Sequence, residues 1–432
     1  MMNLGKYVKT GILIFAVYIY IFNPPIKGLP NLIWLFLPIT LGYLLYYSVI
    51  GRFLYLFKNE IILIVLIILF TWLRDIDWTN GTSSKNFLYL NATMLVDAIP
   101  FSCFIVDICY RHLRLPYKAS DDERLISIIL WTCFFAAVIT IMLLVNPSLN
   151  NLMNNKILAA SEYQQNNLLR GFGFASTLFY SYGLVQGTAA AIILLKMSEG
   201  RKNFIVFFVV LVFLLISILV NARIGMVPVV IMIFYLIFVR KKIKMFLYAS
   251  GILGVILVLF LSSDFAEKYQ KIIDWGFGFF TQTFGFVSGG GSKTHLDTYG
   301  ALGDMIVFPD NIFGWIAGSG ADLFLTGQTS GTVHHSDIGF VRQLYYGGII
   351  YLTLLMTLVT VMAVRLYNLN KHRWFFVLFV FTVIAANIKS NFINNHSSFR
   401  LFLLIYMGFI YYSFMEKQKK ILNKPKGLTE TI

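Results

Sequence analysis

A histidine pair close to a carboxylate and an arginine is the first feature of this sequence that could do chemistry. His334 and His335 are followed by Ser336 and Asp337, and Arg342 comes shortly after them. A histidine can act as a general base near neutral pH, and a neighbouring carboxylate can orient it or raise its pKa. The same residues also suit the polar start of a helix, with Ser336 or Asp337 as the N-cap. Both interpretations stay open.

Two more arginines lie at the ends of apolar runs. Arg170 belongs to a Leu-Arg-Gly-Phe-Gly-Phe sequence, and Arg223 to a short Asn-Ala-Arg-Ile-Gly hairpin between two apolar runs. The planar fork of donors on arginine suits phosphate, and a charge at the membrane edge is costly unless something pairs with it. The alternatives are that Arg170 extends to lipid headgroups and that Arg223 anchors its hairpin.

Other polar residues in apolar surroundings give weaker signals. Asp97 and Asp107 lie within one apolar stretch, which indicates either proton or ion coupling or a displaced span boundary. His396 and Arg400 fall in the last predicted outside loop, where we attribute them to topology. All three cysteines lie in apolar segments, and no Cys/His spacing typical of a metal site appears. We therefore expect no metal and no cofactor.

The elements that must position these residues are long apolar helices. The chain has 432 residues, of which 58% are hydrophobic and 13% charged, and its mean hydropathy is +0.74. A soluble domain of this size does not have such a composition. The net charge of +15 would suit nucleic acid, but Lys and Arg crowd into alternate loops. The positive-inside rule explains that distribution, with anionic lipid as the partner.

The fold predicted from this pattern is an all-α, polytopic integral membrane protein of about twelve helices. Spans 1–9 lie within residues 1–263, with an outside loop near 147–172. A large outside loop carrying some helix covers 264–337, spans 10–12 cover 338–415, and 416–432 form a cytoplasmic tail. The predicted spans are roughly 8–26, 31–50, 58–74, 87–110, 125–146, 173–196, 203–221, 224–239, 245–263, 338–364, 374–388 and 399–415.

Three motifs in this order resemble those of a known family. They are Arg-Gly-x-Gly-Phe entering a span, an Asn-x-Arg-x-Gly hairpin, and a long outside loop that ends in His-Ser-Asp-x-Gly before a Gly-Gly-Ile span. The set resembles the O-antigen and capsular polysaccharide polymerases of the Wzy type, which are similar to the O-antigen ligases. Ligases more often have Asn after this histidine, so the Ser-Asp here favours a polymerase.

The resemblance implies an inverting, metal-independent glycosyltransferase of the bacterial inner membrane whose active site faces the periplasm. Undecaprenyl-pyrophosphate-linked oligosaccharide would be both donor and acceptor, and a chain-length regulator is a possible partner. By resemblance, Arg170 and Arg223 hold the pyrophosphate, and His335, or else His334, activates the acceptor hydroxyl. Because they are close to His335 in the sequence, Arg342 is added to the pyrophosphate-binding residues and Asp337 to the catalytic residues.

Two other functions remain as alternatives. An O-antigen ligase would transfer finished glycan to the lipid A core. A flippase or transporter of lipid-linked oligosaccharide would instead need broken, charged helices at the midplane, near Asp97 and Asp107. The predicted charges gather at the outer interface and in one large loop, which favours an enzyme.

Overall fold

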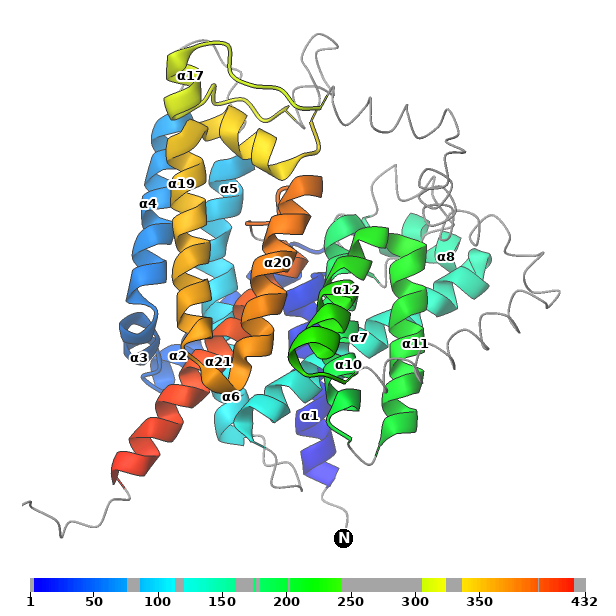
Figure 1. Ribbon diagram of the computed structural model, residues 1–432. Coiled ribbons are helices and arrows are strands. Elements are labelled where there is room, and N and C mark those ends of the chain that lie inside the picture. The colour runs from blue at the N-terminus through cyan, green and yellow to red at the C-terminus, as the bar shows by residue number, and fades with distance from the viewer. Residues whose placement is uncertain are drawn as a thin grey trace, which may run out of the picture.

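The computed structural model is helical throughout the part of the chain that it describes. That part consists of residues 4–75, 86–112, 120–159, 174–175, 179–200, 203–242, 305–323, 336–394 and 396–422. Within it, the only pairing of β type is an isolated antiparallel bridge between Ile26 and Leu158. Most of the long helices run up and down in Figure 1, as in a membrane bundle.

The helices of the first half run from the N-terminus to residue 157. They are α1 (Leu4–Phe22), α2 (Leu32–Tyr46), α3 (Ile50–Leu56), α4 (Lys58–Asp75), α5 (Asn86–Thr93), η1 (Met94–Ala98), α6 (Ile99–His112), α7 (Asp121–Val145), α8 (Pro147–Leu152) and η2 (Met153–Ile157). Those of the second half are α10 (Phe179–Ser198), α11 (Phe204–Asn221), η3 (Arg223–Gly225), α12 (Met226–Phe234), η4 (Tyr235–Val239), α17 (Ile312–Ala317), α19 (Gly339–Tyr367), η5 (Asn370–His372), α20 (Arg373–Lys389) and α21 (Ser397–Leu422).

Several of these helices are long and apolar enough to cross a membrane. Six qualify by length and composition among the described residues, and a bent pair would make a seventh. The six are Phe87–Arg111, Asp121–Val145, Phe204–Asn221, Gly339–Tyr367, Asn370–Lys389 and Ser397–Ile421. The prediction of an all-helical, polytopic membrane protein agrees with this finding. The full set of twelve spans and the large periplasmic loop stay predictions, and the predicted span 245–263 lies outside the described residues.

Two predicted spans are not straight helices. The range 31–50 breaks between α2 and α3, whose axes meet at 90°, and Ser48 in the break has a φ of +52°. The range 338–364 bends at Gly348, whose φ of +63° and ψ of −165° interrupt α19. Figure 1 shows the first part of α19 lying across the top of the bundle before the helix turns downward. Backbone of this kind favours glycine, and apolar periodicity does not reveal it.

Helix α21 forms the centre of the bundle. Its residues 401–412 are all buried, and the helix packs against α1, α6, α7 and α10. A helix that is apolar on every side is expected to be covered by neighbours on every side. Polar residues at the start of such a helix, including Arg400, therefore enter the interior of the protein.

The helix bundle has two ends, which we call the upper and the lower end. The upper end contains Asp75 at the end of α4, Gly339 at the start of α19, and α17; the lower end contains Lys58 and Tyr367. The upper end is at the top of Figure 1. The charge pattern of the sequence predicts that the upper end faces away from the cytoplasm.

Candidate functional site

The candidate site is built around a buried ion pair at the upper end. Arg342, in the first part of α19, donates from Nε and Nη2 to the two carboxylate oxygens of Asp322 at 3.0 and 2.9 Å. Both side chains are buried. This bidentate geometry fixes the plane of the guanidinium. Arg342 was predicted to bind pyrophosphate, and the structure shows two of its nitrogens already engaged by a carboxylate.

Buried amides surround the next residue of α19. Gln343 donates from Nε2 to the side-chain oxygens of Asn387 and Asn391, at 3.2 and 2.7 Å. The backbone carbonyl of Asn391 accepts from the hydroxyl of Tyr180, at 3.0 Å. Gln343 Oε1 and Asn387 Nδ2 are buried and have no hydrogen-bond partner among the described residues. Unsatisfied buried groups are costly, and these two amide atoms are available to hydrogen-bond a bound ligand.

A second buried arginine begins α21. Arg400 Nη2 lies 4.0 Å from Asp97 Oδ1, and its Nη1 donates to the backbone carbonyl of Tyr20 at 3.3 Å. Asp97 belongs to η1, a π-helical turn between α5 and α6. Such turns within α-helices occur frequently at functional sites. Burial of a cation among spanning helices is expensive and suggests a function for Arg400.

His396 is close enough to both arginines to feel their charges, and it is held uncharged. Burial, together with the charges of Arg400 and Arg342, lowers its pKa to about 3. Its ring meets that of Tyr180 edge-on, with 6.2 Å between centroids. With so low a pKa, the imidazole is a poor general base near neutral pH. It is better suited to hydrogen bonding as a neutral group. We call Arg342, Gln343, Asn387, Asn391, His396 and Arg400 the upper polar cluster.

Arg223 is positioned by unusually close helix packing. Its hairpin joins the upper ends of α11 and α12 and lies against α10 (Figure 1). A Cβ atom on Gly183 would come within 2.7 Å of the Ala222 carbonyl oxygen, and one on Gly187 would collide with the carbonyl of Gly225. Glycine is therefore required on α10 for this approach. Arg223 itself is half-buried, which agrees with a location at the membrane edge.

Asp337 is half-buried just before α19. The helix begins at Gly339 with Ile338 as its N-cap residue, so the predicted caps, Ser336 and Asp337, lie one or two positions too early. The Ser336 hydroxyl instead accepts from the Ile338 amide at 3.3 Å.

Three of the predicted site residues, Arg170, His334 and His335, lie outside the described residues, and their roles stay predictions.

Sequence reasoning did not select the main members of the upper polar cluster. Arg400 and His396 were attributed to topology, while Gln343, Asn387 and Asn391 were not considered. A signal was present: the stretch 387–400, which joins two apolar helices, contains seven asparagines or serines. Within a membrane protein, so many amides and hydroxyls in one short connection indicate more than a turn.

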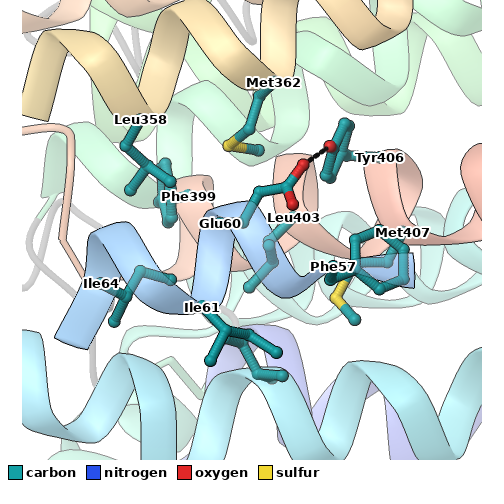
Figure 2. A pocket seen from close by; sticks show the side chains of 11 residues that line it. Phe57, Glu60, Ile61, Ile64, Leu358, Met362, Phe399, Leu403, Tyr406 and Met407 are labelled. Carbon is teal, nitrogen blue, oxygen red and sulfur yellow. Dashed lines mark hydrogen bonds between the residues drawn. The ribbon is translucent and has the colours of Figure 1, made fainter. Parts of the chain in front are cut away.

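The lower end holds carboxylates of a different kind. Figure 2 shows Glu60 of α4 directed at the hydroxyl of Tyr406 on α21, among apolar side chains that line a cavity of about 20 Å³. Such a cavity has room for about one water molecule. Arg365 also donates to Glu60 Oε1, at 2.6 Å. This cavity is too small and too apolar to be a transport pathway.

Asp107, one of the carboxylates on which the transport alternative depended, is also at the lower end. It accepts from Arg111 at 2.7 Å and from the hydroxyls of Tyr411 and Tyr43 at 2.7 and 3.0 Å. Asp97 instead approaches Arg400. The two carboxylates thus belong to separate networks. Among the described residues, no group of three metal-ligating side chains could hold an ion.

No family profile matches this sequence, and a comparison with curated proteins also finds no match.

Proposed function

We propose that the protein is a membrane glycosyltransferase that polymerises undecaprenyl-pyrophosphate-linked oligosaccharides into O-antigen or capsular polysaccharide, at the periplasmic face of the bacterial inner membrane. The observation that carries the proposal is the upper polar cluster. It combines two buried arginines, a neutral histidine and unsatisfied amides at the predicted non-cytoplasmic end. This set of groups suits a substrate with a pyrophosphate and many hydroxyls.

The chemistry needs little beyond positioning and charge stabilisation. The acceptor hydroxyl oxygen forms a bond to the anomeric carbon while the bond from that carbon to the pyrophosphate oxygen breaks. The hydroxyl proton passes to a base, for which His335 remains our proposal, and undecaprenyl pyrophosphate leaves. Inversion follows from attack on the face opposite the leaving group. Preorganised arginines at reduced dielectric stabilise the charge that develops on the leaving oxygen.

Roles within the cluster follow from the contacts. Asp322 fixes the orientation of Arg342, so the guanidinium presents a constant edge to a bound anion. Arg400 supplies a second cation deeper in the bundle. Gln343 and Asn387 offer an amide oxygen and an amide nitrogen to sugar hydroxyls. We propose that Arg170 and Arg223 complete the pyrophosphate site, as the family resemblance implies.

The test is a gel of surface polysaccharide from a strain without this gene, complemented with variants. Wild type should restore the full ladder of repeat lengths. Arg342→Gln should leave lipid A core capped by a single repeat unit and no ladder. The matched control is Arg365→Gln, which removes an arginine paired with a buried carboxylate at the other end of the bundle, and it should restore the ladder.

Other outcomes would contradict the proposal. If deletion abolishes even the single-repeat band while lipid-linked polymer accumulates, the protein is the ligase. If lipid-linked repeat units accumulate on the cytoplasmic side, it is a flippase. A full ladder from Arg342→Gln, with the variant present in the membrane at the wild-type level, would remove the upper polar cluster from the reaction.

A further inference from the structure

The segment before residue 318 exposes an unusual number of large apolar side chains at the upper end. Ile312 is 78% exposed and Phe313 67%, and both belong to α17. Further apolar residues extend the exposed surface on either side of them. They are Ile306, Phe308, Trp315 and Ile316. In water, a patch of this size marks an interaction surface.

This segment is fixed rigidly to the membrane helices. The amides of Ser319 and Gly320 donate to the carbonyls of Tyr345 and Tyr346, at 2.7 and 2.9 Å. A side chain on Gly318, where φ is +78°, would collide with the Tyr346 carbonyl. Gly348 approaches the Ile316 carbonyl in the same way. The bend in α19 and the end of α17 therefore form one packed unit.

The end of α4 supports the same segment from below. Arg74 Nη2 donates to the Gly318 carbonyl at 2.6 Å, and its guanidinium carbon lies 5.9 Å from the centre of the Phe313 ring. The neighbouring side chains Trp72 and Leu73 are exposed, as expected for residues that face lipid. Ile349 and Ile350, just after the bend in α19, are exposed as well. The apolar surface of α17 thus adjoins exposed apolar side chains of α4 and α19.

We propose that α17 lies in the interfacial layer of the bilayer at the upper end, with Ile312 and Phe313 inserted among the lipids. We choose lipid as the partner of this surface for two reasons. The exposed apolar surface of α17 continues onto α4 and α19, and Phe308 stacks on Trp315 with ring centroids 5.3 Å apart. Trp and Phe beside a cation are typical of the membrane interface. The large loop is thereby anchored to the membrane beside the upper polar cluster, whatever reaction that cluster performs.

The experiment uses nitroxide labels on the full-length protein in vesicles of phosphatidylethanolamine and phosphatidylglycerol. Labels are placed at Ile312→Cys and Phe313→Cys; the three native cysteines are buried. The lipid-facing control is Leu73→Cys on α4. The matched aqueous control is Asp310→Cys, an exposed polar position two residues before α17. Collision of each label with oxygen and with a water-soluble nickel complex is measured by power saturation.

The expected result is a ratio of oxygen to nickel collisions at 312 and 313 several-fold above that at 310 and close to that at 73. A nickel-rich ratio equal to that at 310 would place the surface in water and overturn the proposal. Low collision with both reagents would mean that protein, either this chain or a second copy, covers it, and would also overturn it.

A second measurement applies if the cysteine variants do not fold. The fluorescence contributed by Trp315 is obtained by subtracting the spectrum of Trp315→Phe from that of the wild type. Phenylalanine preserves the stack on Phe308. Lipids brominated near the headgroup should quench this difference strongly, whereas an unquenched difference would contradict insertion.

Discussion

The two ends of the bundle stabilise buried carboxylates in different ways. At the lower end the carboxylate is buried and its cation reaches toward the surface: the side chain of Arg365 beside Glu60 is 27% exposed, and that of Arg111 beside Asp107 is 30% exposed. Long basic side chains often bury their stems and keep the charge in water. Such pairs anchor the helices at the predicted cytoplasmic surface.

At the upper end the cations themselves are buried. The side chain of Arg342 beside Asp322 and that of Arg400 beside Asp97 are each only 7% exposed. The desolvation of a buried pair often costs as much as its attraction returns. The pairs of the upper end are therefore poor stabilisers, and we infer that their value lies in the substrate they hold. If the proposed function holds, the comparison separates arginines that anchor helices from arginines that bind substrate.

The largest expected effect is on the reaction. Arg400→Gln should lower polymer formation about 100-fold, because it removes a preorganised cation from the site where negative charge develops. Arg111→Gln, a change of the same type at the lower end, should lower it less than about twofold. Radiolabelled sugar incorporated by membranes with equal amounts of each variant measures both. Equal losses in the two variants would break the distinction between the ends.

The second effect is on stability. At the lower end, removal of an arginine should lower the stability of the protein more than it lowers polymer formation. Arg365→Gln leaves the buried Glu60 carboxylate without its cation and should cost about 1–3 kcal/mol, less than a fully buried pair because Arg365 is partly exposed. The melting temperature in detergent should fall, and the double variant with Glu60→Gln should recover part of the loss. Unchanged melting would mean that the lower pair is dispensable even as an anchor.

A third effect concerns the dependence of stability on pH. The folded protein holds the pKa of His396 at about 3, below the ordinary value of 6.5, so the unfolded chain binds a proton there that the folded protein does not. This contribution to stability is complete above pH 6.5 and is lost progressively as the pH falls toward 3. His396→Gln should flatten the fall in melting temperature between pH 6.5 and 4. An identical slope in variant and wild type would contradict an uncharged His396 in the folded protein.

Much of the helical framework was predictable because the length of an apolar run limits the helix that it can form. Each predicted span other than 245–263 overlaps a described helix, including the stretch with Asp97 and Asp107. The bend at Gly348 was not predictable, because it depends on the contact between α19 and the Ile316 carbonyl. A local pattern does not record such contacts between distant segments.

Some residues of the candidate site were likewise predictable from the sequence, and others were revealed only by the packing of distant segments. Arg223 was selected from the sequence because it stands out against an apolar background, and Arg342 because it follows the histidine pair. Arg400 was assigned to topology because its burial depends on α1 and η1, which precede it by hundreds of residues. For the same reason, the sequence singled out Asp97 but did not show that Arg400 lies beside it. Sequence identifies unusual residues, whereas only the packing shows which of them meet.

The most direct test of the proposed polymerase activity is a reaction with purified protein in vesicles and a lipid-pyrophosphate-linked repeat unit as the sole substrate. We expect a ladder of lipid-linked products and one undecaprenyl pyrophosphate released for each glycosidic bond formed. Arg342→Gln should give neither product, and Arg365→Gln should give both. If wild type forms no longer product from this substrate, or if the two variants lose activity equally, the assignment of the reaction to the upper end is wrong.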